Sequence, residues 1–273
     1  MYENKSEIYS LTEATNLLLE TYKWQTPEIN EIKRYNSHKV RHTFWVLEVW
    51  RNILTIIKEN KKLEDNLINK AEICFILHDI WRFFQNDWKK TLSSIEFDHW
   101  YKSYEIVKKN NYPSDIYLSI KYHSAYSIDW LYNEQDFISM SEKEKEDTIF
   151  LTQLLKDADK VQNILFSIFE YKDIDKNYFD KTLDIFSNWD ISPINIPNIK
   201  NWKLLEIENI KTIWDYILLE LCFTHEIFFK ESYKILNFYN YFDVMFEKIK
   251  KTPYISQESF LMVKDVFEKY KSY

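Results

Sequence analysis

The chain has 273 residues, of which 45% are apolar and 18% aromatic, so it carries ample material for a hydrophobic core. Its net charge of −7 does not favour binding to a polyanion such as duplex nucleic acid. Glycine is absent, although ordinary usage supplies roughly 19 residues in a chain of this length. Sites that depend on glycine are therefore excluded, namely phosphate-binding loops, dinucleotide fingerprints and nucleophile elbows.

Hydrophobic periodicity predicts helices along the whole chain and no convincing set of strands, so the expected fold class is all-α. In chain order, the main helices are predicted at 11–22, 39–60, 71–77, 98–110, 114–123, 141–161, 211–226 and 242–250. A long loop is predicted at 84–97. Because glycine is missing, helix ends are expected to rely on Asn, Lys or Pro.

Local sequence signals predict the starts of two helices, and the absence of targeting signals predicts the compartment. Asp98 is a candidate N-cap, and Ser141 with Glu144 forms a capping-box pattern. The sequence shows no signal peptide and no apolar run of about 18 residues, so we expect a soluble, cytoplasmic protein without a membrane partner. Cys74 and Cys222 lie in apolar helical stretches and are expected to be reduced core residues.

Candidate chemistry centres on His78 and Asp79, which follow the apolar run at 71–77. An imidazole nitrogen and a carboxylate oxygen both suit a hard or borderline divalent cation. Burial of such polar groups at the end of an apolar helix is unfavourable unless they have partners. His38 and His42 lie one helical turn apart, so from the residues alone they compete for the role of an upstream ligand.

A second unusual feature is the acidic segment Lys156-Asp157-Ala158-Asp159-Lys160, which continues an apolar helix. Buried carboxylates need a partner such as a cation, so one of these acids is a candidate metal ligand. Successive residues of a helix are rotated by about 100° about its axis. The side chains of Asp157 and Asp159 are therefore rotated by about 200° from each other and point to nearly opposite sides of the helix.

Five motifs together resemble the HD superfamily of metal-dependent phosphohydrolases, and most closely small bacterial HD-domain proteins with an HDIGRF-like motif. In order, they are His42-Thr43 followed by Val46, the run HDIWRF at 78–83, Asp98-His99, Lys121-Tyr122-His123, and Asp159-Lys160. The resemblance implies an all-α HD-domain helical bundle with a C-terminal helical extension. It divides the chain into an N-terminal packing helix at 1–30, an HD core at 31–165 and an extension of the same domain at 166–273.

The resemblance also implies a set of metal ligands. It selects His42 rather than His38, and it selects Asp159 because the family's aspartate is followed by a basic residue. Asp157 is then expected to support a ligand or cap the helix. The complete implied set is His42, His78, Asp79, His99, His123 and Asp159. It would hold one or two divalent ions, without distinguishing Mn, Fe, Co, Ni, Zn or Mg.

Charge favours two ions. With His42, His78, Asp79 and Asp159 alone, two carboxylates balance one divalent cation, and phosphate attraction would fall to Arg82, Lys121 and Lys160. Adding His99 and His123 permits a second ion, whose charge would attract phosphate and stabilise the transition state. The expected catalytic residues are therefore Asp79, Arg82, Lys121 and Lys160.

The implied activity is hydrolysis of a phosphomonoester or phosphodiester in a small phosphorylated or nucleotide substrate by metal-activated water. Two alternatives remain open: an HD-type di-iron oxygenase, which uses the same four histidines and two aspartates, and a non-catalytic nucleotide-sensing HD module. The physiological substrate and the oligomeric state are not determined by the sequence.

Two tryptophans stand where the resembling family has glycine, Trp81 after His-Asp-Ile and Trp100 after Asp-His. The chain has no glycine and 10 tryptophans. One hypothesis is that UGA codons read as glycine have been translated as tryptophan. The alternative is a genuine glycine-poor protein in which bulky side chains narrow the site.

Overall fold

Helices form every regular element that the computed structural model describes, which confirms the all-α prediction. The described residues are 10–25, 30–84, 99–125, 127–170, 190–201, 203–250 and 256–270. The predicted N-cap Asp98 and most of the predicted loop at 84–97 lie outside them.

The chain divides by its internal contacts into an N-terminal unit, Met1–Ala158, and a C-terminal unit, Asp159–Tyr273. The division falls within helix α8, which runs unbroken from Glu142 to Glu170. The other elements of the N-terminal unit are α1 (Leu11–Gln25), α2 (Asn30–Lys58), α3 (Asp65–Leu77), the 3-10 helix η1 (Ile80–Phe84), α5 (His99–Lys109), α6 (Ser114–Tyr122), the 3-10 helix η2 (Ile128–Asn133) and α7 (Gln135–Ile138).

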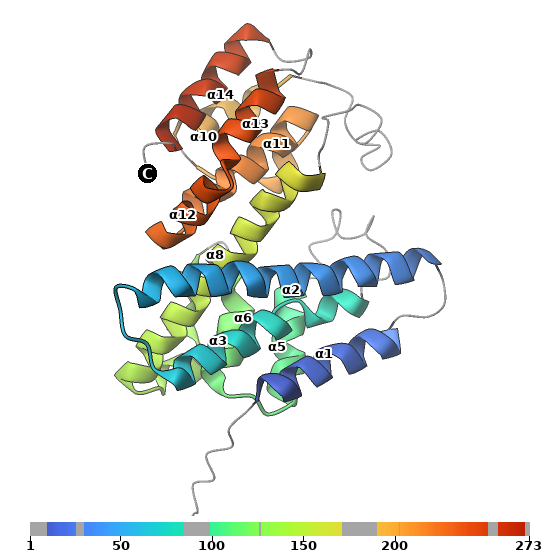
Figure 1. Cartoon of the computed structure of the whole chain (residues 1–273), viewed down its shortest axis with the longest axis vertical. Coiled ribbons are helices and arrows are strands. Elements are labelled where there is room, and N and C mark those ends of the chain that lie inside the picture. Colours follow the sequence, from blue (N-terminus) through green and yellow to red (C-terminus); the bar gives the residue numbers. More distant parts are fainter. Residues whose placement is uncertain are drawn as a thin grey trace, which may run out of the picture. The chain divides into compact units, whose positions relative to one another are not determined.

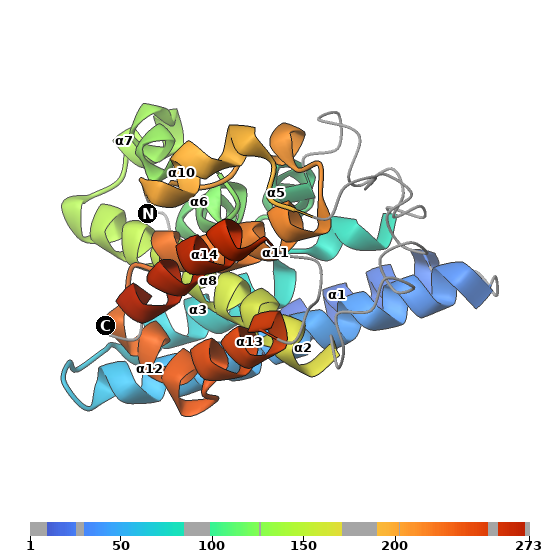
Figure 2. The ribbon, with the colours of Figure 1, turned by 90° about the horizontal axis from the view of Figure 1, so that it is seen from above.

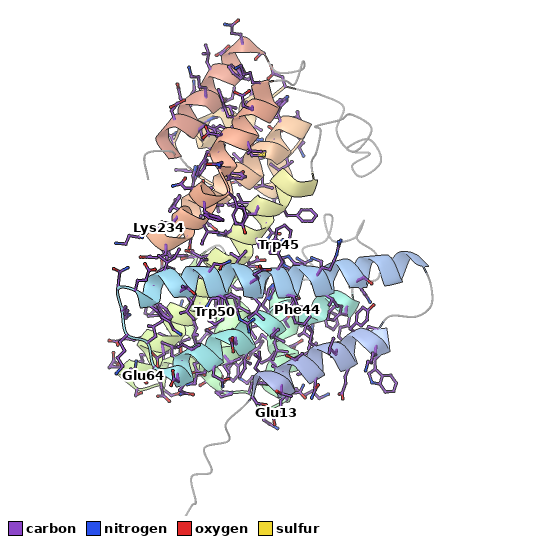
Figure 3. The ribbon with its side chains drawn as sticks, viewed as in Figure 1. Glu13, Phe44, Trp45, Trp50, Glu64 and Lys234 are labelled. Carbon is purple, nitrogen blue, oxygen red and sulfur yellow. The ribbon has the colours of Figure 1, made fainter. Side chains whose placement is uncertain are left out.

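Helix α3 is the centre of the N-terminal unit, where it contacts α1, α2 and α6 (Figure 1). Its sequence explains this position, because the residues from Ile73 to Leu77 are all apolar and all buried. Trp50 of α2 lies against Phe75 of α3 with ring centroids 5.0 Å apart, and Figure 3 shows its place along α2. This packing sets the end of α3 inside the unit.

Helices α5 and α6 lie side by side, as Figure 2 shows. Tyr104 and Tyr117 pack edge to face between them, with ring centroids 5.6 Å apart. The turn that joins the helices contains Asn111 with φ 61°, a left-handed conformation that asparagine adopts more readily than most residues. Asn240 takes the same role after α12, with φ 49°. Asparagine thus ends these two helices where glycine is missing.

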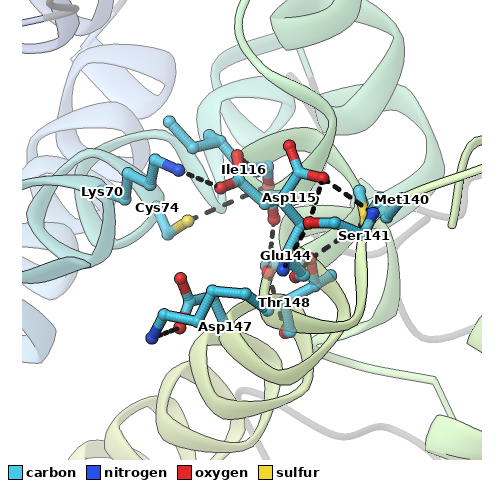
Figure 4. Close-up of polar contacts among 11 residues, drawn as sticks. Lys70, Cys74, Asp115, Ile116, Met140, Ser141, Glu144, Asp147 and Thr148 are labelled. Carbon is cyan, nitrogen blue, oxygen red and sulfur yellow. Dashed lines mark hydrogen bonds and ion pairs between the residues drawn. The ribbon is translucent and has the colours of Figure 1, made fainter. Parts of the chain in front are cut away.

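Polar contacts join α3, α6 and the start of α8 (Figure 4). Lys70 forms an ion pair with the buried Asp115. The predicted capping box is confirmed: the Ser141 amide donates to Glu144 Oε2 at 2.8 Å, and the Glu144 amide donates to Ser141 Oγ at 3.3 Å. Thr148 donates to the Glu144 carbonyl at 2.7 Å.

The C-terminal unit has η3 (Pro193–Asn195), α10 (Ile196–Lys200), η4 (Ile207–Asn209), α11 (Ile213–Cys222), η5 (Phe223–Glu226), α12 (Lys230–Phe238), α13 (Tyr241–Lys250) and α14 (Gln257–Tyr270). Asp215 is fully buried and accepts hydrogen bonds from the Ser192 amide and hydroxyl at 2.9 and 2.5 Å. It also accepts from the Thr212 amide at 3.0 Å, which caps the start of α11.

Two further predictions can be compared with the structure. Cys74 and Cys222 are both free and buried, as expected of core cysteines. Among the described residues, none of the helices has the length and apolar character that crossing a bilayer requires.

Candidate metal centre

The turn after α3 carries the two residues on which the candidate site is built. His78 is fully buried, and Asp79 is 5% exposed. The buried run Ile73–Leu77 ends directly before them, and η1 begins directly after them at Ile80. Because the buried helix ends directly before them, the imidazole of His78 and the carboxylate of Asp79 lie in the interior, where each needs a polar or ionic partner.

Two of the histidines are held by main-chain carbonyls. Nδ1 of His78 lies 2.8 Å from the Phe75 carbonyl, and Nδ1 of His123 lies 2.7 Å from the Ile120 carbonyl. A carbonyl oxygen only accepts, so Nδ1 is the donor in both contacts. In each neutral ring the lone pair is then on Nε2. This second hydrogen bond is the usual way in which a protein orients a metal-ligating histidine.

The carboxylate of Asp79 lies among three histidines. Its Oδ2 is 3.6 Å from Nε2 of His42 and 3.9 Å from Nε2 of His78. Its Oδ1 is 3.6 Å from Nε2 of His99. The two oxygens thus face different histidines, as a carboxylate shared between two ions would.

Two groups of side chains have ligand atoms within 4.8 Å of one another, and they share His78. One group is His42, His78 and Asp159, and the other is His78, Asp79 and His123. Asp159 directly follows Ala158 on the unbroken helix α8, so the part of α8 in the N-terminal unit sets its place. Two ligand atoms about 2.2 Å from one ion are at most about 4.4 Å apart, so the donors of each group lie close to the spacing that a divalent cation requires.

Electrostatics favour the protonation states that a metal ion needs. Burial alone would raise the pKa of Asp79, but Arg82, His78 and Lys39 hold it well below its usual range. Burial, together with the charge of Arg82, lowers the pKa of His99 well below its ordinary value. Near neutral pH the aspartate is therefore ionised and this histidine neutral, which are the forms that bind metal.

The three basic residues expected to attract phosphate have different surroundings. Arg82 Nε lies 3.6 Å from Oδ1 of Asp79. In contrast, Lys121 donates to Glu134 at 2.5 Å, and Lys160 forms an ion pair with Glu226. Arg82 is therefore the one of the three that the structure sets beside the central carboxylate.

Sequence reasoning missed Lys39, whose ammonium nitrogen lies 3.8 Å from Oδ2 of Asp79. Its position three residues before His42 on one helix was a usable signal, because residues at that spacing share a face. It also missed Ser124, whose hydroxyl is 3.4 Å from Nε2 of His99, and Asn163, whose amide donates to Oδ1 of Asp159 at 3.2 Å.

Trp81 and Trp100, the two tryptophans expected at glycine positions of the family, are both half-buried. The Trp81 ring stacks on Phe84 at 4.7 Å between centroids, and its amide donates to Ser103 Oγ at 3.2 Å. Its indole nitrogen is buried and has no hydrogen-bond partner among the described residues. Trp100 packs edge to face on Tyr101, with ring centroids 6.1 Å apart.

Comparison with protein families matches residues 40–164 to the family model described as HD domain. All six expected metal ligands lie within the matched segment, whereas Lys39 lies just outside it. No curated protein and no solved structure gives a significant match.

Proposed function

Because residues 40–164 form an HD domain, of a superfamily of metal-dependent hydrolases, we propose that this protein is a phosphohydrolase acting on a small phosphorylated molecule. The family accounts for metal-dependent hydrolysis in general. We propose in addition that the bond cleaved is a phosphoester. We also propose that duplex nucleic acid is not a substrate, because a net charge of −7 disfavours binding to a polyanion.

The observation that carries this proposal is the position of Arg82 beside Asp79. Its Nε lies 3.6 Å from Oδ1, on the same side of the carboxylate as His99. Its side chain is 20% exposed, so part of it is open to solvent. Guanidinium groups bind phosphate oxygens through paired hydrogen bonds, which suits a phosphoryl group held against the metal ligands.

In this proposal the residues have distinct tasks. His42, His78, Asp79 and Asp159 would hold one divalent ion. His99 and His123 would complete a second site that shares Asp79, because His78 has only Nε2 free and can serve one ion. Bound divalent ions supply Lewis-acid activation of water and of a phosphoryl oxygen. Arg82 orients the phosphoryl group and stabilises its developing charge. Asn163 and the Phe75 and Ile120 carbonyls hold the ligands in place.

The same ligand set is also compatible with a second candidate, an HD-type di-iron oxygenase. The same four histidines and two aspartates would hold two irons, so the ligand set does not separate the two functions. The substrate and the need for oxygen do separate them.

The test is metal analysis of the purified protein followed by two assays. Metal-free protein is loaded with Mn²⁺ or Fe²⁺ and offered a panel of phosphomonoesters and phosphodiesters, with and without oxygen. Hydrolysis is followed as inorganic phosphate released from the monoesters and as monoester and alcohol formed from the diesters. Hydrolysis that needs metal, proceeds without oxygen and is lost in Asp79→Asn supports a phosphohydrolase. The matched control is Asp65→Asn, an exposed acid on the first turn of the same helix, α3.

Two outcomes would contradict the proposal. Oxygen consumption with iron and no hydrolysis of any phosphomonoester or phosphodiester would favour the oxygenase. Saturable nucleotide binding with no turnover under any metal would favour a sensing module.

A further inference from the structure

Lys39 is a second cation at the central carboxylate, and nothing in the ligand set requires it. It lies on α2, one turn before His42, and its ammonium is 3.8 Å from Oδ2 of Asp79. The side chain is 18% exposed, so it is held close to the site while one part remains open to solvent.

Lys39 and Arg82 lie at opposite oxygens of the same carboxylate. Lys39 is at Oδ2 with His42, and Arg82 is at Oδ1 with His99. Both side chains are about four-fifths buried. Partial burial weakens solvent screening, so each cation acts more strongly on a nearby anion than an exposed lysine would.

The charge of the loaded site then defines what it binds best. The two carboxylates of Asp79 and Asp159 balance one divalent ion, and neutral histidines add nothing. Lys39 and Arg82 therefore leave two positive charges, which match a doubly charged anion. A second ion would raise the positive charge further and strengthen the same preference.

From this arrangement we propose that Lys39 is a substrate-binding residue that, together with Arg82, makes the site selective for the dianionic phosphoryl group of a phosphomonoester over the monoanionic group of a phosphodiester. The inference rests on the proposed phosphohydrolase function and narrows its substrate class. A phosphomonoester carries close to two negative charges above about pH 7, whereas a phosphodiester carries one.

The competing explanation is that Lys39 only neutralises Asp79 while no ion is bound. These two roles predict opposite results for metal binding and phosphate binding. A lysine that merely competes with the ion would, when removed, leave phosphate affinity unchanged and raise metal affinity. A lysine that holds the phosphoryl group would, when removed, lower phosphate affinity, because its flexible four-carbon stem lets the ammonium turn from Asp79 to the ligand.

The experiment measures binding by calorimetry to the Mn²⁺-loaded protein at about pH 8, where inorganic phosphate is mainly a dianion. Inorganic phosphate is compared with dimethyl phosphate, a monoanion that shares its phosphoryl core. The variants are Lys39→Gln, Lys39→Met and Lys39→Arg. The control is Lys58→Gln, an exposed lysine in the last turn of the same helix. Mn²⁺ affinity and melting temperature are recorded for each protein.

We expect Lys39→Gln and Lys39→Met to bind inorganic phosphate about tenfold to a hundredfold more weakly, as for the loss of a hydrogen bond to a charged group. Their loss of dimethyl phosphate affinity should be clearly smaller. Lys39→Arg should retain most of the phosphate affinity, and Lys58→Gln should match the wild type.

Unchanged phosphate affinity in both neutral variants, with tighter Mn²⁺ binding, would overturn the inference, as would a wild-type protein that binds no phosphate. An equal loss for the two anions would overturn the selectivity. If phosphate binding depends on Lys39 but no phosphoester is hydrolysed, the inference stands as a binding site and the proposed hydrolase function fails.

Discussion

Lys156 donates a hydrogen bond of 2.5 Å from its ammonium group to the main-chain carbonyl of Ala125. The lysine is 2% exposed and lies on α8, three residues before Asp159, whereas Ala125 lies two residues after His123. A buried cation is unfavourable unless it has such acceptors, and here the acceptor is near the C-terminal end of α6, where a positive charge is favourable. Lys156 therefore ties two ligand-bearing segments together.

Replacing Lys156 by methionine should weaken metal binding without removing any ligand. Outer partners that only orient metal ligands typically change affinity by about 10–100-fold, and we expect a decrease in this range. Titration of metal-free protein with Mn²⁺ measures it. Lys145→Met, in the first turns of the same helix and paired with the exposed Glu142, is the control and should bind metal normally. A Lys156→Met protein with unchanged affinity and a lower melting temperature would show a purely structural role.

Asp79→Asn should remove metal binding while the helices stay folded. The substitution keeps the size of the side chain and removes the charge shared by both candidate ions, so we expect a loss of more than about a hundredfold in affinity. Metal content after dialysis and far-ultraviolet circular dichroism measure the two properties. A variant that retains a full complement of metal would exclude Asp79 as a ligand.

His123→Ala tests whether the centre holds two ions. The imidazole of His123 packs against those of His78 and His99, with ring centroids 5.2 and 5.7 Å away. Loss of this ligand should lower the bound metal from two equivalents to one, because His42, His78, Asp79 and Asp159 remain. His225→Ala, a histidine of η5 outside the cluster, is the control. A wild-type protein with one equivalent would contradict the binuclear proposal.

Glu134→Gln should destabilise the protein in a pH-dependent way. Glu134 accepts hydrogen bonds from Lys121 at 2.5 Å and from the Tyr122 hydroxyl. Burial opposes ionisation, but these two donors lower the pKa of Glu134 below its ordinary value. Ionised Glu134 thus contributes stability above its unfolded pKa of about 4.3, and this contribution is lost as the pH falls through the lower folded pKa.

The expected cost of Glu134→Gln at pH 7 is about 1–2 kcal/mol, since a charge-assisted hydrogen bond is lost. The difference from wild type should narrow as the pH falls below about 4. Urea unfolding at several pH values measures it. Glu142→Gln removes an exposed ion pair on the surface and should have little effect at any pH. A difference between Glu134→Gln and wild type that stayed constant down to acidic pH would contradict the assigned ionisation.

The codons of Trp81 and Trp100 test the recoding hypothesis directly. The indole N–H of Trp81 is buried without an acceptor among the described residues, but so are those of Trp50 and Trp214, so this feature does not separate the two hypotheses. UGA codons at both positions would support glycine in the natural protein, and UGG codons would end the idea. If glycine is natural, the double variant Trp81→Gly, Trp100→Gly should hydrolyse phosphoesters faster than the tryptophan form. No gain would count against crowding of the site.

The helices were largely predictable because their apolar residues recur at helical spacing. The starts of α1 and α6 and the capping box of α8 agree with the predictions. Helix α2 begins at Asn30, nine residues before the predicted Lys39. Its first turns are too polar to show periodicity, and long-range contacts hold them instead: the Asn36 amide donates to the Gln25 carbonyl at 3.1 Å, and Ser37 Oγ lies 3.2 Å from the Tyr22 hydroxyl.

The sequence predicted which residues are candidate metal ligands, but it did not predict which side chains surround and pair with the residues of the site. His42, His78 and Asp159 were chosen from motif order, and whether they bind a metal stays a prediction. The partners of the basic residues could not be read from the sequence. Lys121 and Lys160 are held by Glu134 and Glu226, which are 13 and 66 residues away along the chain. Such pairings depend on tertiary packing, which local periodicity does not encode.

The two buried cysteines give each unit its own reporter of opening. Cys74 belongs to the N-terminal unit and Cys222 to the C-terminal unit. Burial raises the pKa of both thiols, that of Cys222 to about 12, so neither reacts readily while its surroundings stay closed. The rate at which a thiol reagent labels each one therefore measures how often its own unit unfolds. Metal added to the protein should slow labelling of Cys74, four residues from His78, and any slowing at Cys222 would reveal coupling between the two units.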